Sequence, residues 1–252
     1  MKKDFNVAME TKKVIEWIQV YFKNNKSAKG AILGISGGKD STVVSALLVE
    51  ALGKDRVYGV LLPNGVQKDI SDSLKVVKDL DIKYSIVNIA DSFNGLVDNI
   101  QEFQYLSDQS LINIAPRIRM ATLYAIGQTL GYRVCGTGNK SESYVGYTTK
   151  FGDSSSDFNP ISDFDTEEVI AIGDYLGISH NLVHKIPSDG LCAKSDEENL
   201  GFTYHQLNEY MDNGTCGDKK IDMDIFWKHE ASLHKFNPIP TFKKIIIQKG
   251  DR

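Results

Sequence analysis

The chain has 252 residues, a length typical of one large α/β domain or two small ones. Hydrophobic residues make up 41% and charged residues 25% of the chain, which excludes a wholly disordered protein. The net charge of −4 excludes the overall basic field that attracts nucleic acid or an anionic membrane. We therefore expect neither a nucleic-acid partner nor a membrane partner.

The cysteines and the apolar runs indicate a compartment. Cys135, Cys192 and Cys216 are widely spaced and form no CxxC pair, so neither a disulfide framework nor a structural zinc site is expected. Residues 1–14 lack the continuous apolar stretch of a signal peptide, and later apolar runs are too short to cross a bilayer. These features predict a cytoplasmic protein.

The predicted elements of the first half alternate between helix and strand. Apolar residues at helical spacing between Val14 and Phe22 predict an amphipathic first helix. Short apolar runs predict four strands, at Ala31–Ile35, Val57–Leu62, Tyr84–Ile89 and Tyr132–Gly136. Further helices are expected over Val43–Ala51, Asp69–Leu80 and Ile112–Leu130.

This alternation predicts an α/β fold with a doubly wound, mostly parallel sheet and flanking helices. In such sheets ligands bind outside the carboxyl ends of the strands. After Gly138 the chain changes to a loop rich in Gly, Ser and Asp, followed by two short predicted helices and a polar section. Because no repeat or linker divides the chain, we expect residues 1–252 to form a single domain with a polar helical C-terminal section.

A glycine-rich loop between the first predicted strand and its helix is chemically the most informative segment. It runs from Gly34 to Ser41 and reads GISGGKDS. Glycines let the backbone approach a phosphate, and the helix that follows supplies free N–H groups and a positive dipole end. The loop is not a Walker A motif, because Lys39 is followed by Asp40 and the spacing to Gly34 is one residue short.

Asp40 is an unusual residue for a phosphate-binding loop. A carboxylate in this position repels a phosphate unless a cation lies between them, so Asp40 suggests bound Mg²⁺. The alternative is a tight strand–helix turn in which Asp40 only complements the positive end of the helix dipole. Taken alone, the loop favours nucleotide binding.

The segment SGGKDS at residues 36–41 resembles the SGGxDS loop of the ATP pyrophosphatase superfamily. Members of that superfamily split ATP into AMP and pyrophosphate while they adenylate a substrate. Further segments resemble the NAD synthetase family and follow in the same order, namely RIRM at 117–120, GTGNKSE at 136–142, GYTTKFGD at 146–153, DFNPI at 157–161, PSDGL at 187–191, SDE at 195–197, LG at 200–201 and HK at 234–235. The resemblance covers nearly the whole chain.

The resemblance implies a carbon–nitrogen ligase that converts deamido-NAD to NAD. ATP would adenylate the nicotinate carboxylate with release of pyrophosphate, and ammonia would then displace AMP. The implied partners are ATP as co-substrate, Mg²⁺, deamido-NAD, ammonia and a second copy of the chain in a homodimer, with the helix from Ile112 contributing. Neither length nor motif leaves room for a glutaminase domain, so free ammonia is the expected nitrogen donor.

The resemblance also implies roles for individual residues. The expected ATP contacts are Gly34, Ile35, Ser36, Gly37, Gly38, Lys39, Asp40, Ser41, Thr137 and Ser188. The expected deamido-NAD contacts are Arg117, Lys150, Asp157, His234 and Lys235. Asp40 and Glu142 would bind Mg²⁺, and Asp40, Lys150 and Asp157 would be catalytic. Without the resemblance, Lys150 and Asp157 would be read as solvated loop charges.

Two residues depart from the family pattern close to the expected polyphosphate. Thr166 stands where the family usually carries a lysine, and Asp189 stands where a small residue is usual. Two unit charges ~4 Å apart interact by about 4 kcal/mol at an effective dielectric near 20, so each departure is large enough to affect phosphate binding. Lys39 and Lys194 are candidates to compensate, and a second Mg²⁺ at Asp189 is another option.

These departures keep two alternative functions open. One is a diverged ATP-dependent amide ligase of the same fold that acts on another carboxylate. The other is a non-catalytic dinucleotide-binding protein.

Overall fold

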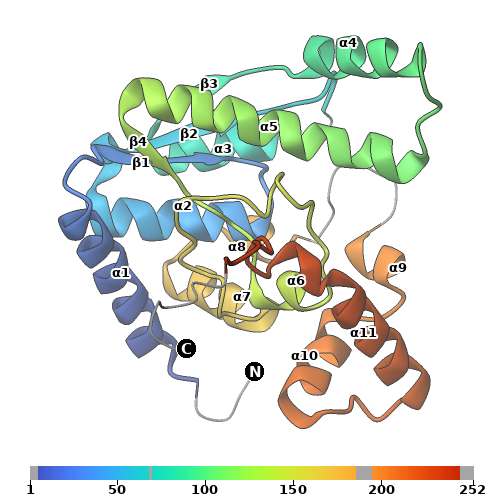
Figure 1. Ribbon diagram of the computed structural model, residues 1–252. Coiled ribbons are helices and arrows are strands. Elements are labelled where there is room, and N and C mark those ends of the chain that lie inside the picture. The colour runs from blue at the N-terminus through green and yellow to red at the C-terminus, as the bar shows by residue number, and fades with distance from the viewer. Residues whose placement is uncertain (1–4, 68–69, 186–194, 245–252) are drawn as a thin grey trace, which may run out of the picture.

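The computed structural model describes residues 5–67, 70–185 and 195–244. The described strands are β1 (Gly30–Gly34), β2 (Val57–Leu61), β3 (Lys83–Ile86) and β4 (Tyr132–Val134). They form one sheet in the order β3-β2-β1-β4, and every pairing is parallel (Figure 1). The prediction of a parallel, doubly wound sheet is confirmed, and the observed strands are one to three residues shorter or shifted at their ends.

Helices cover both faces of the sheet. On one face lie α1 (Val7–Asn24), α2 (Lys39–Leu52) and α3 (Ile70–Asp79), and on the other lie α4 (Ala90–Gln101) and α5 (Asp108–Leu130) (Figure 1). Successive residues of β1 face opposite layers, because Ile32 packs toward α5 while Ala31 and Leu33 pack toward α1 and α2. A strand buried on both faces must be apolar throughout, which explains the run at residues 31–33.

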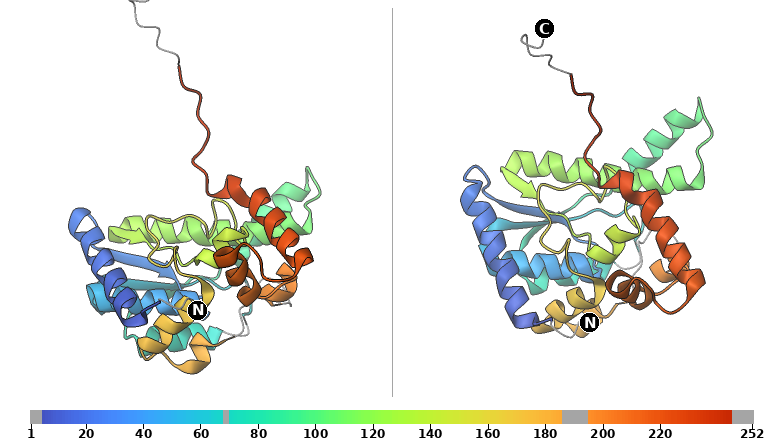
Figure 2. Two further views of the ribbon diagram at one scale, coloured as in Figure 1. Left: turned by 90° about the horizontal axis from the view of Figure 1, so that it is seen from below. Right: turned by 60° about the horizontal axis from the view of Figure 1, so that its bottom comes forward.

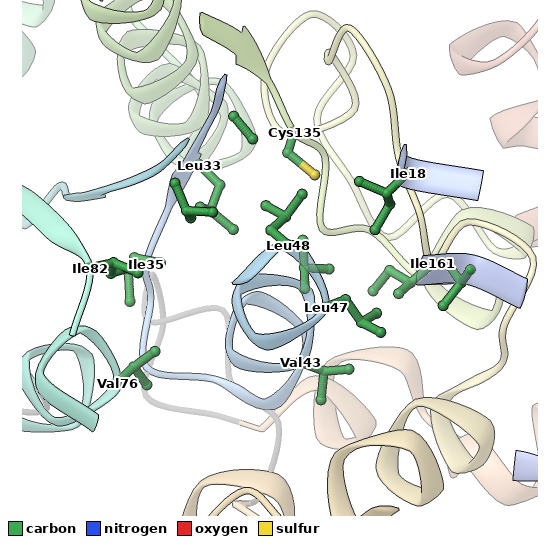
Figure 3. Close-up of a cluster of buried hydrophobic side chains, with 14 of the residues drawn as sticks. Ile18, Leu33, Ile35, Val43, Leu47, Leu48, Val76, Ile82, Cys135 and Ile161 are labelled. Carbon is green, nitrogen blue, oxygen red and sulfur yellow. The ribbon is translucent and has the colours of Figure 1, made fainter. Parts of the chain in front are cut away.

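The larger apolar core lies between the sheet and α1, α2 and α3. Ile18, Leu33, Leu47 and Leu48 are fully buried in it, and Cys135 closes one end (Figure 3). This core holds β1 and α2 rigidly against each other. The loop between these two elements, which is the glycine-rich segment, is therefore anchored at both ends.

The region between β3 and α5 corrects the sequence reading. The predicted third strand ends at Ile86 rather than Ile89, and helix α4 follows it at Ala90–Gln101. No residue of α4 is buried, but Phe93, Val97 and Ile100 lie at helical spacing, so the sequence carried a helix signal that our prediction missed. Helix α5 begins at Asp108, four residues before the predicted start, because the Ser107 side chain caps it by accepting from the Ser110 N–H.

The second half of the chain is more helical than predicted. The sequence suggested two short helices after Gly138, whereas the described residues contain α6 (Lys140–Tyr144), α7 (Thr166–Tyr175), α8 (His180–Val183), α9 (Asp196–Leu200), α10 (Tyr204–Asn213) and α11 (Lys219–Ser232). Short 3₁₀ turns lie at Lys54–Arg56 and Leu233–Lys235.

Helices α6, α9, α10 and α11 gather beside the sheet and share a small apolar core that includes Val145, Leu207 and Ile225. Residues 238–244 then run away from the body as an extended segment (Figure 2). Within the described ranges, no helix combines the length and apolar character needed to span a bilayer.

Candidate active site

A cavity of about 930 Å³ opens at the carboxyl edge of the sheet. The segments that follow β1, β2 and β4 line it, through residues such as Ser36, Leu62 and Thr137. The chain runs outward from β1 through β2 to β3 and then returns to the other side of β1 as β4, so the cavity lies at the topological switch point. The N-terminal half of α5 and the α6–α9–α11 helices form its other walls.

The glycine-rich loop has a conformation that requires its glycine. Gly37 has a φ of +78°, and a Cβ there would lie 2.8 Å from the Ser73 backbone nitrogen. The Ser36 hydroxyl accepts from the Gly38 N–H at 3.2 Å, and the Ser41 hydroxyl accepts from the Ser36 N–H at 3.3 Å. Helix α2 starts directly afterwards, so its free N–H groups face the cavity where an anion would bind.

Two carboxylates from distant parts of the chain meet beside this loop. Asn139, which is fully buried, donates through Nδ2 to Asp40 Oδ1 at 3.1 Å. The Asn139 backbone N–H donates to Glu142 Oε2 at 3.2 Å, and Asn139 Oδ1 accepts from the Glu142 N–H at 3.0 Å. The same asparagine therefore caps α6 and links Asp40 to Glu142.

The electrostatics of the site are dominated by these carboxylates. Burial and then the neighbouring Asp40 charge raise the pKa of Glu142 to about 8, although Lys39 acts in the opposite direction. For Lys39 burial acts in the opposite direction and would lower the pKa, but Asp40 and Glu142 together raise it above its usual value. The Lys39 ammonium donates to Asp40 Oδ2 at 2.7 Å.

A third carboxylate, Asp196, completes what we call the acid cluster, namely Asp40, Glu142 and Asp196. Asp196 lies at the start of α9, is 5% exposed and lines the cavity. The Tyr204 hydroxyl donates to Asp196 Oδ2 at 3.4 Å, and the burial of Tyr204 among these carboxylates raises its pKa. Sequence reasoning gave Asp196 no role, although it belongs to the matched Ser195–Glu197 segment.

The donor set of the acid cluster fits Mg²⁺ only together with a further ligand. In the part of the chain that the structure describes, no three His, Cys, Asp or Glu residues are arranged to hold a metal ion by themselves. Mg²⁺ in nucleotide enzymes is usually held by one or two carboxylates plus substrate phosphates and water. Asp40 and Glu142, at the glycine-rich loop, are carboxylates of that kind.

Four of the expected deamido-NAD contacts cluster around one loop. Arg117 Nε donates to the Lys150 carbonyl at 3.3 Å, and the Lys150 ammonium donates to the His234 carbonyl. Lys235 donates to the carbonyls of Gly146 and Thr148, and burial lowers its pKa. Lys235 lines the cavity, whereas Arg117, Lys150 and His234 lie just outside its lining.

Asp157 lies apart from this group. It follows β4, and its Oδ2 accepts from the Val134 N–H at 2.8 Å. Burial and then the Asp157 charge raise the pKa of Tyr21 and of Tyr124, which places both tyrosines beside this carboxylate. Tyr124 lies two turns along α5 from Arg117, and both are exposed. The two groups thus border opposite ends of one exposed face of α5.

The remaining predicted residues are placed as follows. Gly34, Ile35, Gly38 and the rest of the loop except Gly37 line the cavity, as does Thr137. Ser188, Asp189 and Lys194 lie outside the described residues. Thr166 is 4% exposed at the start of α7 and does not line the cavity, so among the described residues Lys39 is the candidate for the compensating positive charge.

A glycine-rich loop at the switch point of a parallel sheet, with carboxylates beside it, is the arrangement of a nucleotide-binding protein of the ATP pyrophosphatase-like fold. The sequence model of the family described as NAD synthase matches residues 10–245. The chain therefore belongs to the NAD synthase family, which confirms the resemblance found in the sequence.

Individual relatives agree with this assignment. The chain is 40% identical over 200 residues to the NH3-dependent NAD+ synthetase of Thermococcus sibiricus, a match that covers 79% of this chain and 78% of that protein. An NMN synthetase structure from Francisella tularensis has a TM-score of 0.88 and 31% identity, covering 96% of this chain and all of that one. An NH3-dependent NAD synthetase structure from Campylobacter jejuni has a TM-score of 0.78 and 27% identity, covering 95% and 100%.

Proposed function

We propose that this chain is an ammonia-dependent NAD synthetase, which uses ATP to amidate deamido-NAD and releases AMP and pyrophosphate. The observation that carries the proposal is that Asn139 links Asp40, in the Gly34–Ser41 loop, to Glu142 beside the cavity. A carboxylate is a poor acyl donor until its oxygen becomes part of a good leaving group. A site that binds ATP phosphates next to a second substrate meets this requirement by adenylation.

The loop residues have distinct tasks in this reaction. The backbone of Gly38 and the start of α2 bind phosphate oxygens. The Ser36 hydroxyl contacts the Ser41 hydroxyl and accepts from the Gly38 N–H, and these contacts fix the loop conformation. Asp40 and Glu142 are positioned to hold Mg²⁺, which supplies charge neutralisation to the departing pyrophosphate when it is bound. Asn139 holds these two carboxylates next to each other through its hydrogen bonds to both. Thr137 is a further ATP contact.

The dinucleotide extends from the cavity along α5 in this proposal. Arg117, Lys150, His234 and Lys235 supply positive or polar groups near its pyrophosphate, and Asp157 acts at the far end. Lys150 and Asp157 are the residues expected to act on the reacting dinucleotide. Because most of these groups border an exposed helix face, a second copy of the chain packed on α5 would enclose the substrate. We therefore expect a homodimer.

A second candidate is amidation of the same nicotinate carboxyl on a mononucleotide. Two observations favour it, namely the TM-score of 0.88 to a protein named NMN synthetase and the lower value of 0.78 to one named NH3-dependent NAD synthetase. The chemistry of adenylation and amide formation is unchanged, since only the size of the carboxylate substrate differs. This candidate is a specific form of the diverged amide ligase considered from the sequence.

A competition experiment separates the two candidates. The protein receives ATP, Mg²⁺ and ammonium with equal concentrations of deamido-NAD and nicotinate mononucleotide, and chromatography follows both amides over time. The ratio of initial rates equals the ratio of kcat/KM values. We expect NAD to form faster. Faster formation of nicotinamide mononucleotide would replace the first proposal by the second. If no amide of either substrate forms, both proposals are contradicted.

A further inference from the structure

Lys39 differs from the other lysines of the cavity in being buried. Among the cavity-lining lysines of the described residues, Lys185, Lys228 and Lys235 are partly exposed, whereas Lys39 is 4% exposed. Its ammonium donates to Asp40 at 2.7 Å and lies 5.6 Å from the centre of the Tyr204 ring. A buried ammonium is tolerated only when negative charge is paired with it. The acid cluster provides that charge.

We propose that Lys39 is an internal counter-ion of the acid cluster, so that the chain binds no divalent cation alone and acquires Mg²⁺ only together with ATP. The inference rests on the proposed function for the identity of the nucleotide. It goes beyond that function because it assigns the loop lysine a task before any substrate is bound.

The contacts of Asp40 support this assignment. Its Oδ2 accepts from Lys39, and its Oδ1 accepts from Asn139 Nδ2 at 3.1 Å. A cation that used Oδ2 would meet the ammonium at close range, where two like charges repel strongly in a partly buried site. Oδ2 becomes accessible to a metal when the ammonium finds another anion. The phosphates of ATP, bound at the loop that carries Lys39, are such an anion.

The cluster geometry leads to the same conclusion. Asp40, Glu142 and Asp196 come from α2, α6 and α9 and line the same cavity as Lys39, yet they form no ready three-ligand metal site in the described part of the chain. The ammonium therefore neutralises the cluster without strict coordination geometry. A metal that has no preformed cage must bring further oxygen ligands, which the ATP phosphates supply.

The test measures binding of Mn²⁺, a spectroscopic substitute for Mg²⁺, to the full chain without nucleotide. Paramagnetic resonance of free Mn²⁺ gives the bound fraction. Wild type is expected to show no saturable site, whereas Lys39→Met is expected to show one at least about tenfold tighter than the weakest binding that the titration detects. Lys185→Met is the matched control, because it removes another cavity lysine that donates to a carboxylate, Asp72, at 2.7 Å. The control should behave as wild type.

A second arm adds the non-cleavable analogue α,β-methylene-ATP to wild type, which should then remove more free Mn²⁺ than the same analogue removes without protein. This arm decides the question if Lys39→Met fails to fold. Tight Mn²⁺ binding by nucleotide-free wild type would overturn the proposal, as would a folded Lys39→Met protein with no gain. Neither measurement requires turnover, so the result is independent of whether the chain makes NAD.

Discussion

Asn139 shows how one side chain can organise a site from distant segments. Asp40 and Asn139 are 99 residues apart in sequence, yet they are in contact because β1 and β4 are neighbours and each ends at the same edge of the sheet. The asparagine also caps α6, so the position of Glu142 is set by helix formation itself. The hydrogen bonds of Asn139 thus fix the positions of both candidate metal ligands before any ligand binds.

Substitution of Asp40 tests the role of this carboxylate. Asp40→Asn keeps the shape of the side chain but removes the charge that the proposed Mg²⁺ requires. We expect kcat/KM for ATP to fall about 100-fold or more, because metal charge stabilisation is worth several kcal/mol. Circular dichroism should show an unchanged fold. Activity within a few-fold of wild type would contradict the metal assignment.

The raised pKa of Glu142 predicts how stability depends on pH in the metal-free protein. Its pKa rises from 4.5 when unfolded to about 8 when folded. Between these values the folded state holds more protons than the unfolded state, so the free energy of unfolding falls as pH rises through this window. The contribution of the neutral carboxyl is complete below about pH 4.5 and lost above about pH 8.

Glu142→Gln isolates this effect, because glutamine also completes the capping box but does not ionise. Urea unfolding in the presence of a chelator should show the variant gaining stability over wild type by on the order of 4 kcal/mol between about pH 5 and about pH 8.5. A difference that is constant with pH would mean that Glu142 titrates near its ordinary value.

At the level of elements, the accuracy of prediction follows burial. The strands were predicted to within a few residues because β1 and β2 are buried on both faces and read as apolar runs. Helix α4, none of whose residues is buried, was missed although Phe93, Val97 and Ile100 lie at helical spacing. Helices α9 and α10 bury little, but Ser195 with Glu198 and Thr203 with Gln206 form capping boxes, a signal that the sequence carried.

The same distinction applies to the candidate site. The glycine-rich loop and the Asn139–Glu142 segment are local motifs. Their residue types and spacing therefore allowed the part of the cavity that they line to be predicted from the sequence. The position of Asp196 depends on how α9 packs through Leu200 against the small helical core, which no local pattern encodes. The pairing of Lys39 with Asp40, and its burial by Tyr204, likewise require the folded arrangement.

The conformation of the glycine-rich loop can be tested by substituting Gly37, with Gly53 as the control position. Gly37 and Gly53 have φ values of +78° and +79°, but a Cβ would clash with the Ser73 backbone only at Gly37, since nothing lies within 4 Å at Gly53. Gly53→Ala should cost about 1 kcal/mol, the penalty of the backbone conformation alone. Gly37→Ala should cost about 1–3 kcal/mol and raise the KM for ATP. Equal effects on KM would contradict the role of the loop.

For the whole molecule, the exposed face of α5 is the predicted contact between two copies. It carries Arg117, Ala121 and Tyr124, which are exposed and share one face of the helix at i, i+4 and i+7 spacing. In a two-fold interface Ala121→Glu places two like charges near each other, so the dimer dissociation constant should rise about tenfold or more. Ala8→Glu, the same change on an exposed position of α1, should have no effect. Analytical ultracentrifugation measures both, and a monomeric wild type would contradict the dimer.

The central claim is that one cavity activates a nicotinate carboxylate with ATP and delivers it to ammonia. The most direct test supplies the protein with ATP, Mg²⁺, deamido-NAD and ¹⁵N-labelled ammonium, and follows the products by nuclear magnetic resonance. The account predicts ¹⁵N in the carboxamide of NAD, with one AMP and one pyrophosphate formed for each amide. Release of ADP and phosphate instead, or unlabelled substrate with ATP intact, would contradict it.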